Sequence, residues 1–186
     1  MTLHPLPQPD PGPESSRAGS ERSLTIRIAE YPEQTAEDFG RTFADLQALI
    51  ESAALAVMRN RMISVPAGQQ LDRARGAVYG VHVARIRYES PLEVVFFIGA
   101  AGGVGTALFD RIVDLYMKVQ RARVETAEAD VAVARSHYEV NQIHHAVEII
   151  KQEVTGASEL QQTIHGAARA LTNMESAEID PGTSAG

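Results

Sequence analysis

The chain has 186 residues, with 17 basic and 24 acidic side chains and a formal net charge of −7. This acidic balance argues against a protein that coats nucleic acid through its overall charge. The sequence contains no cysteine, which excludes disulfides, thiolate nucleophiles, iron–sulfur clusters and cysteine-ligated zinc.

Both ends of the chain predict disorder. Residues 1–23 carry five prolines among serine, glycine and charged residues, and no apolar run there would offset the entropy cost of ordering. Residues 175–186 are small and polar in the same way. The first residues also lack the basic start and apolar core of a secretory signal, so we expect a cytoplasmic protein.

The first predicted elements are a strand and a helix. Residues 24–28 alternate apolar and polar side chains, as in a short half-buried strand. Thr35, with Asp38 three positions later, has the spacing of a helix N-cap. An apolar stripe with helical spacing follows, so the first helix is predicted at 36–61.

Two more strands are predicted after a connector. Residues 64–76 contain proline and glycine and predict a connector with room for one helical turn. Residues 81–88 alternate in polarity, which predicts a strand with one solvent-exposed face. Residues 92–98 are β-branched and aromatic, so we expect a strand that returns antiparallel through a tight turn at 89–91.

A long helix is the most specific prediction. Residues 106–155 contain neither glycine nor proline and are rich in Ala, Val, Glu, Arg and Gln. This composition predicts a single helix of about 47 residues and about 70 Å. Such a helix is longer than a compact domain of this size is wide. A last amphipathic helix is predicted at 158–173.

The apolar residues of the long helix recur with heptad spacing. With Ile112 at position a, eleven of the thirteen a and d sites are apolar, and every a residue is β-branched. This repeat predicts packing against another helix in a left-handed supercoil. The predicted interface, called here the heptad seam, comprises Ile112, Leu115, Val119, Ala122, Val133, Val140, Ile143, Val147, Ile150 and Val154.

Two arrangements of the heptad seam stay open. In a parallel homodimer Lys118 would face Arg123 and Glu125 would face Asp130, and both contacts are repulsive. An antiparallel or heterotypic bundle avoids them, so we expect a homo-oligomer or a helical protein partner. The other arrangement places the heptad seam in the core of the chain's own domain. A second apolar stripe favours three or more helices and comprises Met117, Val124, Ala127, Val131, Ala134 and Tyr138.

The glycine-rich centre leaves a membrane span open over 94–109. The segment is short for a bilayer, which needs about 20 apolar residues. A strand, a glycine-rich turn and a helix start explain the same residues, so a membrane-associated location is the alternative. A nucleotide-binding loop is not indicated, because no lysine precedes Thr106 and Leu108 stands where the third glycine of G-x-G-x-x-G belongs.

Histidines on the long helix suggest a metal site only weakly. His137, His144 and Glu148 share one helix face with Asn141, and a divalent metal there would need further ligands from a partner helix. The plainer interpretation is a solvated flank of a coiled coil, so we expect neither a metal nor a cofactor. No G-x-S-x-G elbow or other catalytic signature is present, so we expect a non-enzymatic protein.

Basic residues gather in the middle of the chain. Residues 59–91 carry six basic and two acidic side chains. The arginines are suited to phosphate, anionic lipid or the acidic surface of a neighbouring subunit. Because the segment lacks interleaved aromatics on which bases would stack, nucleic acid is not the expected partner.

Residues 86–95, with the sequence IRYESPLEVV, contain a Tyr-x-Ser-Pro-Leu motif before the glycine-rich turn and the long helix. This segment resembles parts of uncharacterised bacterial, mainly actinobacterial, proteins. Some of these look like accessory components of signalling or defence gene clusters. The resemblance implies a bacterial adaptor and brings no catalytic residues with it.

We expect an α+β fold and four segments along the chain. A disordered arm (1–23) precedes a small domain (24–105), in which a helix packs on an antiparallel or mixed sheet of about three strands. The long helix and the C-terminal helix (106–174) then serve oligomerisation, and a disordered tail (175–186) ends the chain. The expected function is a non-enzymatic, self-assembling scaffold or adaptor that acts through the long helix.

Overall fold

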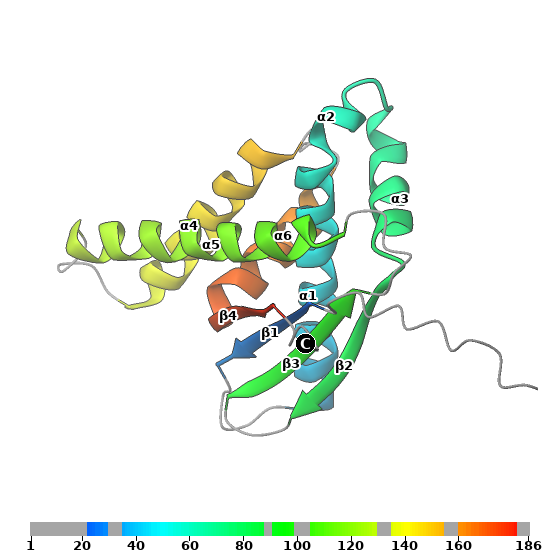
Figure 1. The fold of residues 1–186 in the computed structure, drawn as a ribbon. Coiled ribbons are helices and arrows are strands. Elements are labelled where there is room, and N and C mark those ends of the chain that lie inside the picture. The colour runs from blue at the N-terminus through cyan, green and yellow to red at the C-terminus, as the bar shows by residue number, and fades with distance from the viewer. Residues whose placement is uncertain are drawn as a thin grey trace, which may run out of the picture.

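The computed structural model describes residues 22–29, 35–87, 91–98, 105–129, 135–154 and 160–181. Within these residues the chain is an α+β fold with a four-stranded antiparallel sheet and six helices. In Figure 1 helices lie behind the sheet and beside one of its edges. The face of the sheet that no helix covers in this view points toward the viewer. The predicted fold class is confirmed, and the sheet has one strand more than expected.

The sheet is built from β1 (Ser23–Ile28), β2 (Val81–Arg87), β3 (Leu92–Ile98) and β4 (Met174–Asp180). The strand order is β2-β3-β1-β4, and every neighbouring pair is antiparallel. Strands β1 and β2 therefore run parallel with β3 between them, and β3 and β4 run parallel with β1 between them. This is the split β-α-β arrangement.

Alternation along the central strands separates a core face from an outer face. Residues that share the core face are paired in register, and they are Leu24 with Phe96, Ile26 with Val94, and Ile28 with Leu92. All six are buried. Thr25 and Arg27 lie on the outer face, because successive side chains of a strand point to opposite sides. The strands predicted at 24–28 and 81–88 from alternation and at 92–98 from β-branched and aromatic residues are confirmed.

Helix α1 (Ala36–Val57) begins where the sequence predicts it. The Thr35 hydroxyl accepts a hydrogen bond from the Asp38 backbone N–H (3.2 Å), and the Asp38 carboxylate accepts one from the Thr35 N–H (3.0 Å). This reciprocal cap satisfies two backbone donors that a helix start leaves unpaired. The cap and the acidic residue are thus confirmed.

The segment 64–76, predicted as a connector with room for one helical turn, contains a longer helix than expected. After α2 (Arg59–Met62), an eleven-residue helix, α3 (Ala67–Ala77), occupies most of it. Pro66 stands just before α3, where a missing N–H costs nothing. The remaining residues are mostly good helix formers, and buried Ala74 anchors the helix to the core.

The predicted single helix is wrong, because the structure contains two helices, α4 (Ala107–Ala129) and α5 (Arg135–Glu153). Residues 130–134 lie outside the described part. Glu153 at the end of α5 contacts Arg111 near the start of α4, and it contacts Lys118 at the middle of α4 with an Nζ to Oε1 distance of 2.6 Å, so the two helices run antiparallel. A hairpin shelters apolar side chains of both helices in one core, where a free rod would expose them.

Charged groups join the two helices of the hairpin. Arg111 and Lys118 on α4 both bind the Glu153 carboxylate, and Asp114 binds both cations. Burial by itself would raise the pKa of Glu153, but hydrogen bonds and charge from Lys118 and Arg111 hold this pKa below its usual range. The hairpin therefore has an ionic contact in addition to its apolar one.

The predicted disordered tail is wrong over its first half. Helix α6 (Gln161–Asn173) leads directly into β4, which pairs with β1 from Ser23 to Ile28. Met174 is buried, and Ala177 and Ile179 pack against the core. The segment gains backbone hydrogen bonds from β1, which its small polar composition does not reveal. Of the residues predicted to be disordered, 1–21 and 182–186 lie outside the described part.

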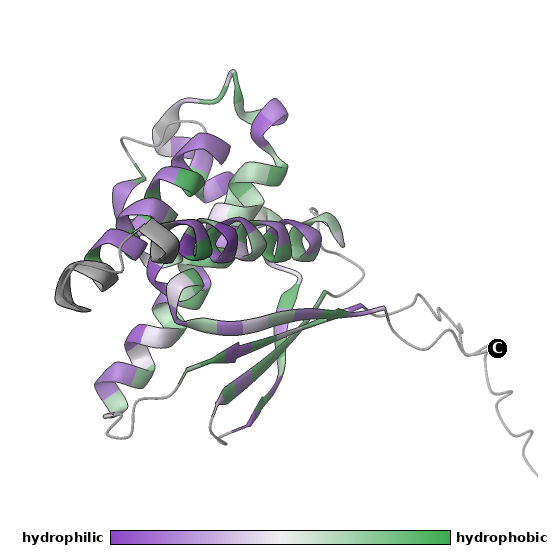
Figure 2. Cartoon of the chain, turned by 90° about the vertical axis from the view of Figure 1, so that its left-hand side faces the viewer, coloured by the Kyte–Doolittle hydropathy of each residue, from purple (hydrophilic) through white to green (hydrophobic). Residues whose placement is uncertain are grey.

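The membrane alternative at 94–109 is not what the structure shows. Residues 94–98 belong to β3, and α4 begins only at Ala107. Within the described ranges, no helix has the length and apolar character that a bilayer crossing requires. Figure 2 shows hydrophilic residues distributed along the helices as well as hydrophobic ones.

Candidate functional site

Most described residues of the heptad seam lie inside this chain. Ile112, Leu115, Val119, Val147, Ile150 and Val154 are buried in the core that α1 and the sheet also form. Ala122 and Ile143 are partly buried, Val140 is 68% exposed, and Val133 lies outside the described residues. The structure therefore gives the buried residues an intramolecular role.

The structure describes the side chains of two of the three weak metal candidates. His144 and Glu148 are exposed, and the side chain of His137 lies outside the described residues. A hydrogen bond from Lys151 (2.8 Å) holds the pKa of Glu148 below its usual range. Among the residues that the structure describes, no group of three His, Asp or Glu side chains is arranged to hold a metal.

The two edges of the sheet differ. Helix α4 lies along β4, and the Tyr116 hydroxyl donates a hydrogen bond to the Glu175 carbonyl. In the described part of the chain β2 pairs with β3 alone, and residues 82–87 are all exposed. An edge strand presents backbone N–H and C=O groups that a further strand is able to pair with. The β2 edge is therefore a candidate binding surface.

An apolar groove lies between β2 and α1. It has a volume of about 550 Å³ and opens beside the β2 edge. Its apolar walls come from Phe43, Leu46 and Ile50 of α1 and from Val81, Val83 and Phe96 of the sheet. Val83 is 47% exposed, so a large part of an apolar side chain faces solvent at this edge.

A cationic cluster occupies the outer face of the sheet, across β1, β3 and β2. The carboxylate of Glu93 contacts Arg27 Nε at 3.3 Å, Arg85 Nη2 at 3.4 Å and Arg87 Nε at 3.9 Å. Glu93 is only 14% exposed, whereas the three arginine side chains are about half exposed. Three guanidinium groups thus share one carboxylate at the surface.

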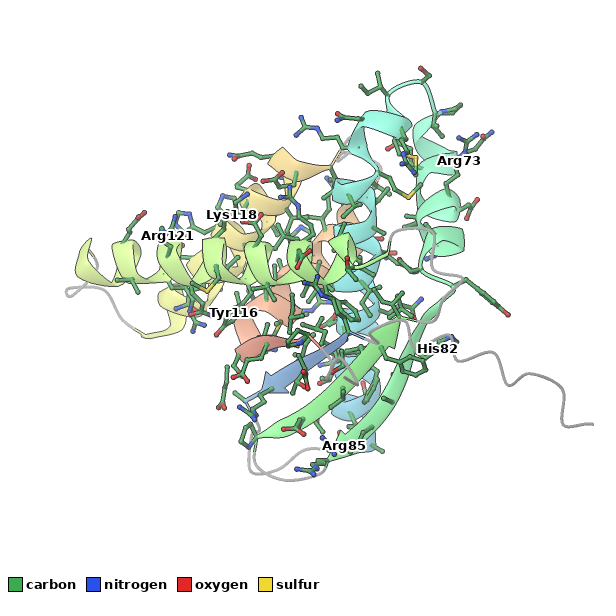
Figure 3. All side chains as sticks on the ribbon, in the orientation of Figure 1. Arg73, His82, Arg85, Tyr116, Lys118 and Arg121 are labelled. Carbon is green, nitrogen blue, oxygen red and sulfur yellow. The ribbon has the colours of Figure 1, made fainter. Side chains whose placement is uncertain are left out.

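An aromatic pair lies on this outer face as well. His82 on β2 stacks on Phe97 of β3 with ring centroids 5.1 Å apart, and Figure 3 shows His82 and Arg85 along the same strand. The sequence did not reveal this pair, because the aromatic partner of the basic segment comes from the next strand. Only the register of β2 with β3 places His82 opposite Phe97.

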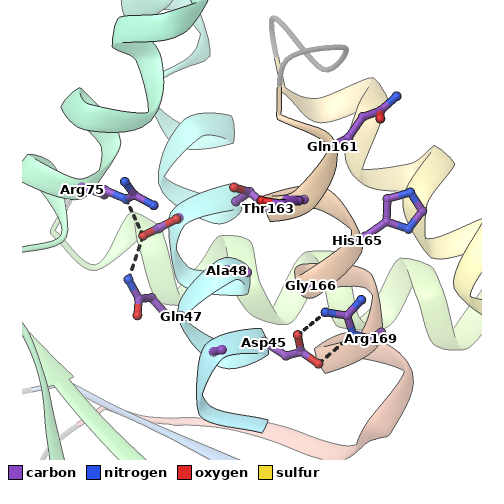
Figure 4. A pocket seen from close by; sticks show the side chains of 12 residues that line it. Asp45, Gln47, Ala48, Arg75, Gln161, Thr163, His165, Gly166 and Arg169 are labelled. Carbon is purple, nitrogen blue, oxygen red and sulfur yellow. Dashed lines mark hydrogen bonds and ion pairs between the residues drawn. The ribbon is translucent and has the colours of Figure 1, made fainter. Parts of the chain in front are cut away.

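A second, polar groove of about 630 Å³ lies between α1, α3 and α6. Figure 4 shows its two ion pairs. Asp45 is buried and accepts hydrogen bonds from Arg169 Nε (2.9 Å) and Nη2 (2.6 Å). Glu51 is also buried, and one of its oxygens accepts from Arg75 Nε (2.9 Å) and Gln47 Nε2 (3.0 Å).

The charges of the polar groove are balanced within it. The hydrogen bond to Asp45 raises the pKa of the Arg169 guanidinium, and the hydrogen bond to Glu51 raises that of Arg75. Each buried carboxylate is neutralised by an arginine of another helix, which holds that helix on α1. We therefore interpret this groove as structural, and the β2 edge with its apolar groove and cationic face as the candidate functional site.

This site was only partly foreseeable. The exposed face of β2 and its arginines follow from the alternation at 81–88, whereas the apolar groove depends on where α1 packs.

Comparisons with family models, curated proteins and solved structures give no match to this chain.

Proposed function

We propose that this chain is a non-enzymatic adaptor that binds an extended segment of a partner protein along the β2 edge. The observation that carries the proposal is the exposure of residues 82–87 beside the apolar groove. An extended peptide that joins a sheet edge gains backbone hydrogen bonds, and its alternate side chains enter the neighbouring pocket.

The features of β2 favour selective pairing over indiscriminate pairing. The register of β2 with β3 shifts between Val83 and Arg85, which makes Ala84 the extra residue of a bulge. Bulges and charged side chains are the usual means by which proteins limit edge-to-edge aggregation. A partner strand must therefore match both the bent backbone and the arginines.

The polar groove supports the non-enzymatic part of the proposal. Asp45 and Glu51 are the buried acidic groups there, and both are engaged by arginines that hold α6 and α3 in place. A carboxylate acts as a general base only if it is able to accept a proton from the substrate. Carboxylates committed to buried ion pairs are poorly suited to that task.

The test is a selection of displayed random peptides against the full-length chain, without regard to their charge. Peptides that bind the wild-type chain should lose binding to Val83→Asp and keep it with Val124→Asp. Both substitutions replace an exposed valine, 47% and 60% exposed, so both variants should fold, which circular dichroism checks. Equal binding to both variants, or no selected peptide at all, would refute the proposal.

A second candidate function, self-assembly, is favoured by exposed apolar residues on the hairpin. Met117 and Val124, seven positions apart on α4, are 52% and 60% exposed, and Val140 on α5 is exposed as well. A second copy would cover such a stripe. Light scattering of the full chain over a concentration series should then show a mass above the monomer, which Met117→Glu/Val124→Glu reduces. A monomer at every concentration would exclude it.

A further inference from the structure

We propose that the partner strand at the β2 edge is acidic on one face and apolar on the other, with carboxylates opposite Arg85 and Arg87. This inference rests on the proposed function and names the chemistry of the partner. Its basis is the cationic cluster around Glu93 of β3, in which Arg85 and Arg87 lie on the outer face of β2, the strand that forms an edge of the sheet in the described part of the chain.

The position of each β2 side chain decides which partner side chains it meets. Arg85 and Arg87 are in register with Val95 and Glu93 on the outer face, whereas Val83 is in register with Phe96 on the core face. Directly opposed residues of two antiparallel strands have Cβ atoms about 5 Å apart and interact. A strand added to β2 would therefore present one face to the two arginines and the other to the apolar groove.

The charge balance of the cluster favours an incoming anion. Arg27 also contacts Glu178 at 3.5 Å, so within the described ranges the ion pairs of the cluster join three cations to two carboxylates. Arg85 and Arg87 have only Glu93 among these, at 3.4 and 3.9 Å. A carboxylate from a partner would add charge-assisted hydrogen bonds to guanidinium groups that are about half exposed.

The same charges disfavour a second copy of this chain at the β2 edge. If two β2 strands paired antiparallel, the arginines of each copy would approach those of the other, and like charges across strands are destabilising. Strand β4 carries Glu178 on the outer face, but α4 lies along the edge of β4. The occupant is therefore a different protein.

Single-stranded nucleic acid fits the outer face less well. The stacked pair of His82 and Phe97 offers one aromatic platform, whereas strands of nucleic acid are held by several stacked bases and by a continuous basic groove. Nucleic acid is accordingly an outcome of the test that would overturn the inference.

The test uses three fluorescent probes with the full-length chain, and binding is measured by anisotropy. The probes are a nine-residue peptide of alternating Glu and Val, a matched peptide of alternating Lys and Val, and a ten-nucleotide oligouridylate. We expect the acidic peptide to bind the wild type about tenfold more tightly than the basic one, which corresponds to about 1.4 kcal/mol and to two exposed ion pairs. Tighter binding of the oligouridylate would overturn the inference.

A charge reversal with a matched control identifies the arginines. Arg85→Glu/Arg87→Glu should reverse the preference between the two peptides. Arg73→Glu/Arg121→Glu makes the same change in net charge at exposed arginines on α3 and α4, labelled in Figure 3, and should preserve the wild-type preference. If Arg85→Glu/Arg87→Glu fails to fold, Arg85→Gln/Arg87→Gln is used in its place. This neutral variant should abolish the preference between the two peptides. An unchanged preference in either β2 variant would overturn the inference.

The outcomes for the partner's chemistry and for the proposed function are distinguishable. Suppose that Val83→Asp abolishes the binding of the selected peptides but that these peptides are not enriched in acidic residues. Then β2 is a docking edge and the inference about the partner's charge is wrong. If no selected peptide loses binding in Val83→Asp, both the inference and the proposed function are wrong.

Discussion

Gly166 lies at a close contact between α6 and α1, and its replacement by alanine should destabilise the fold. A Cβ at this position would lie 2.8 Å from the Ala48 Cβ and 3.3 Å from Asp45 Oδ1. Carbon atoms in favourable contact are about 3.5–4.0 Å apart, so the added methyl group would force the two helices apart or displace the ion pair of Asp45 with Arg169.

The magnitude follows from two opposing effects. Alanine in the interior of a helix is favoured over glycine by about 1 kcal/mol, and overpacking of a tight contact costs about 1–3 kcal/mol. The strain at the helix crossing should exceed the gain in propensity, because backbone-anchored atoms on both sides limit relaxation. We expect a net loss of about 1–2 kcal/mol, or a melting temperature lower by about 2–8 °C for a chain of this size.

Urea denaturation followed by circular dichroism measures the change. The control is Gly40→Ala in α1, where nothing lies within 4 Å of the added Cβ, so a gain of about 0.5–1 kcal/mol is expected there. In the double variant Ala48→Gly/Gly166→Ala the clash is removed, and the loss should be smaller than the sum of the two single losses. If Gly166→Ala stabilises the chain as much as Gly40→Ala does, the close approach of the helices is not real.

Three further predictions concern the ion pairs and the heptad seam. Asp45→Asn should cost about 1–3 kcal/mol in urea denaturation, because Arg169 loses its charged partner; a loss below about 0.5 kcal/mol would contradict this. Because the pKa of Glu153 is depressed in the fold, its contribution to stability is present above the ordinary value of 4.5 and is lost as the pH falls. The stability gap between wild type and Glu153→Gln should therefore be about 1–2 kcal/mol at neutral pH and narrow in acid, and a constant gap would disprove the ion pair. Ile150→Ala should cost about 2–5 kcal/mol, and Val140→Ala less than about 0.5; a loss for Ile150→Ala that varied with protein concentration would indicate an intermolecular seam.

Local signals predicted those elements that depend on neighbouring residues. The strands predicted from alternation (β1 and β2), the strand predicted from β-branched and aromatic residues (β3) and the cap formed by Thr35 and Asp38 are all present in the structure. Each depends on residues within a few positions of one another, so the sequence contains the whole signal. Arg85 and Arg87 of the candidate site belong to the strand that the alternation at 81–88 predicts, whereas Arg27 was not singled out.

Other features depend on residues that are far apart in the chain. The strand β4 is stabilised by pairing with β1, about 150 residues earlier, and no local pattern predicts that pairing. The stacking of His82 on Phe97 likewise requires the register between β2 and β3. The apolar groove exists only because α1 packs beside the β2 edge.

The heptad seam shows most clearly which features the sequence determines and which the tertiary structure determines. By itself the sequence determined that residues 112–129 and 135–153 form helices with an apolar side, because helix periodicity and propensity are properties of the local chain. It did not determine what covers that side. The tertiary structure decided it, since folding into the antiparallel pair α4 and α5 buries Ile112 and Ile150 in one core with α1 and the sheet, and burial depends on surfaces that come together only when the whole chain has folded.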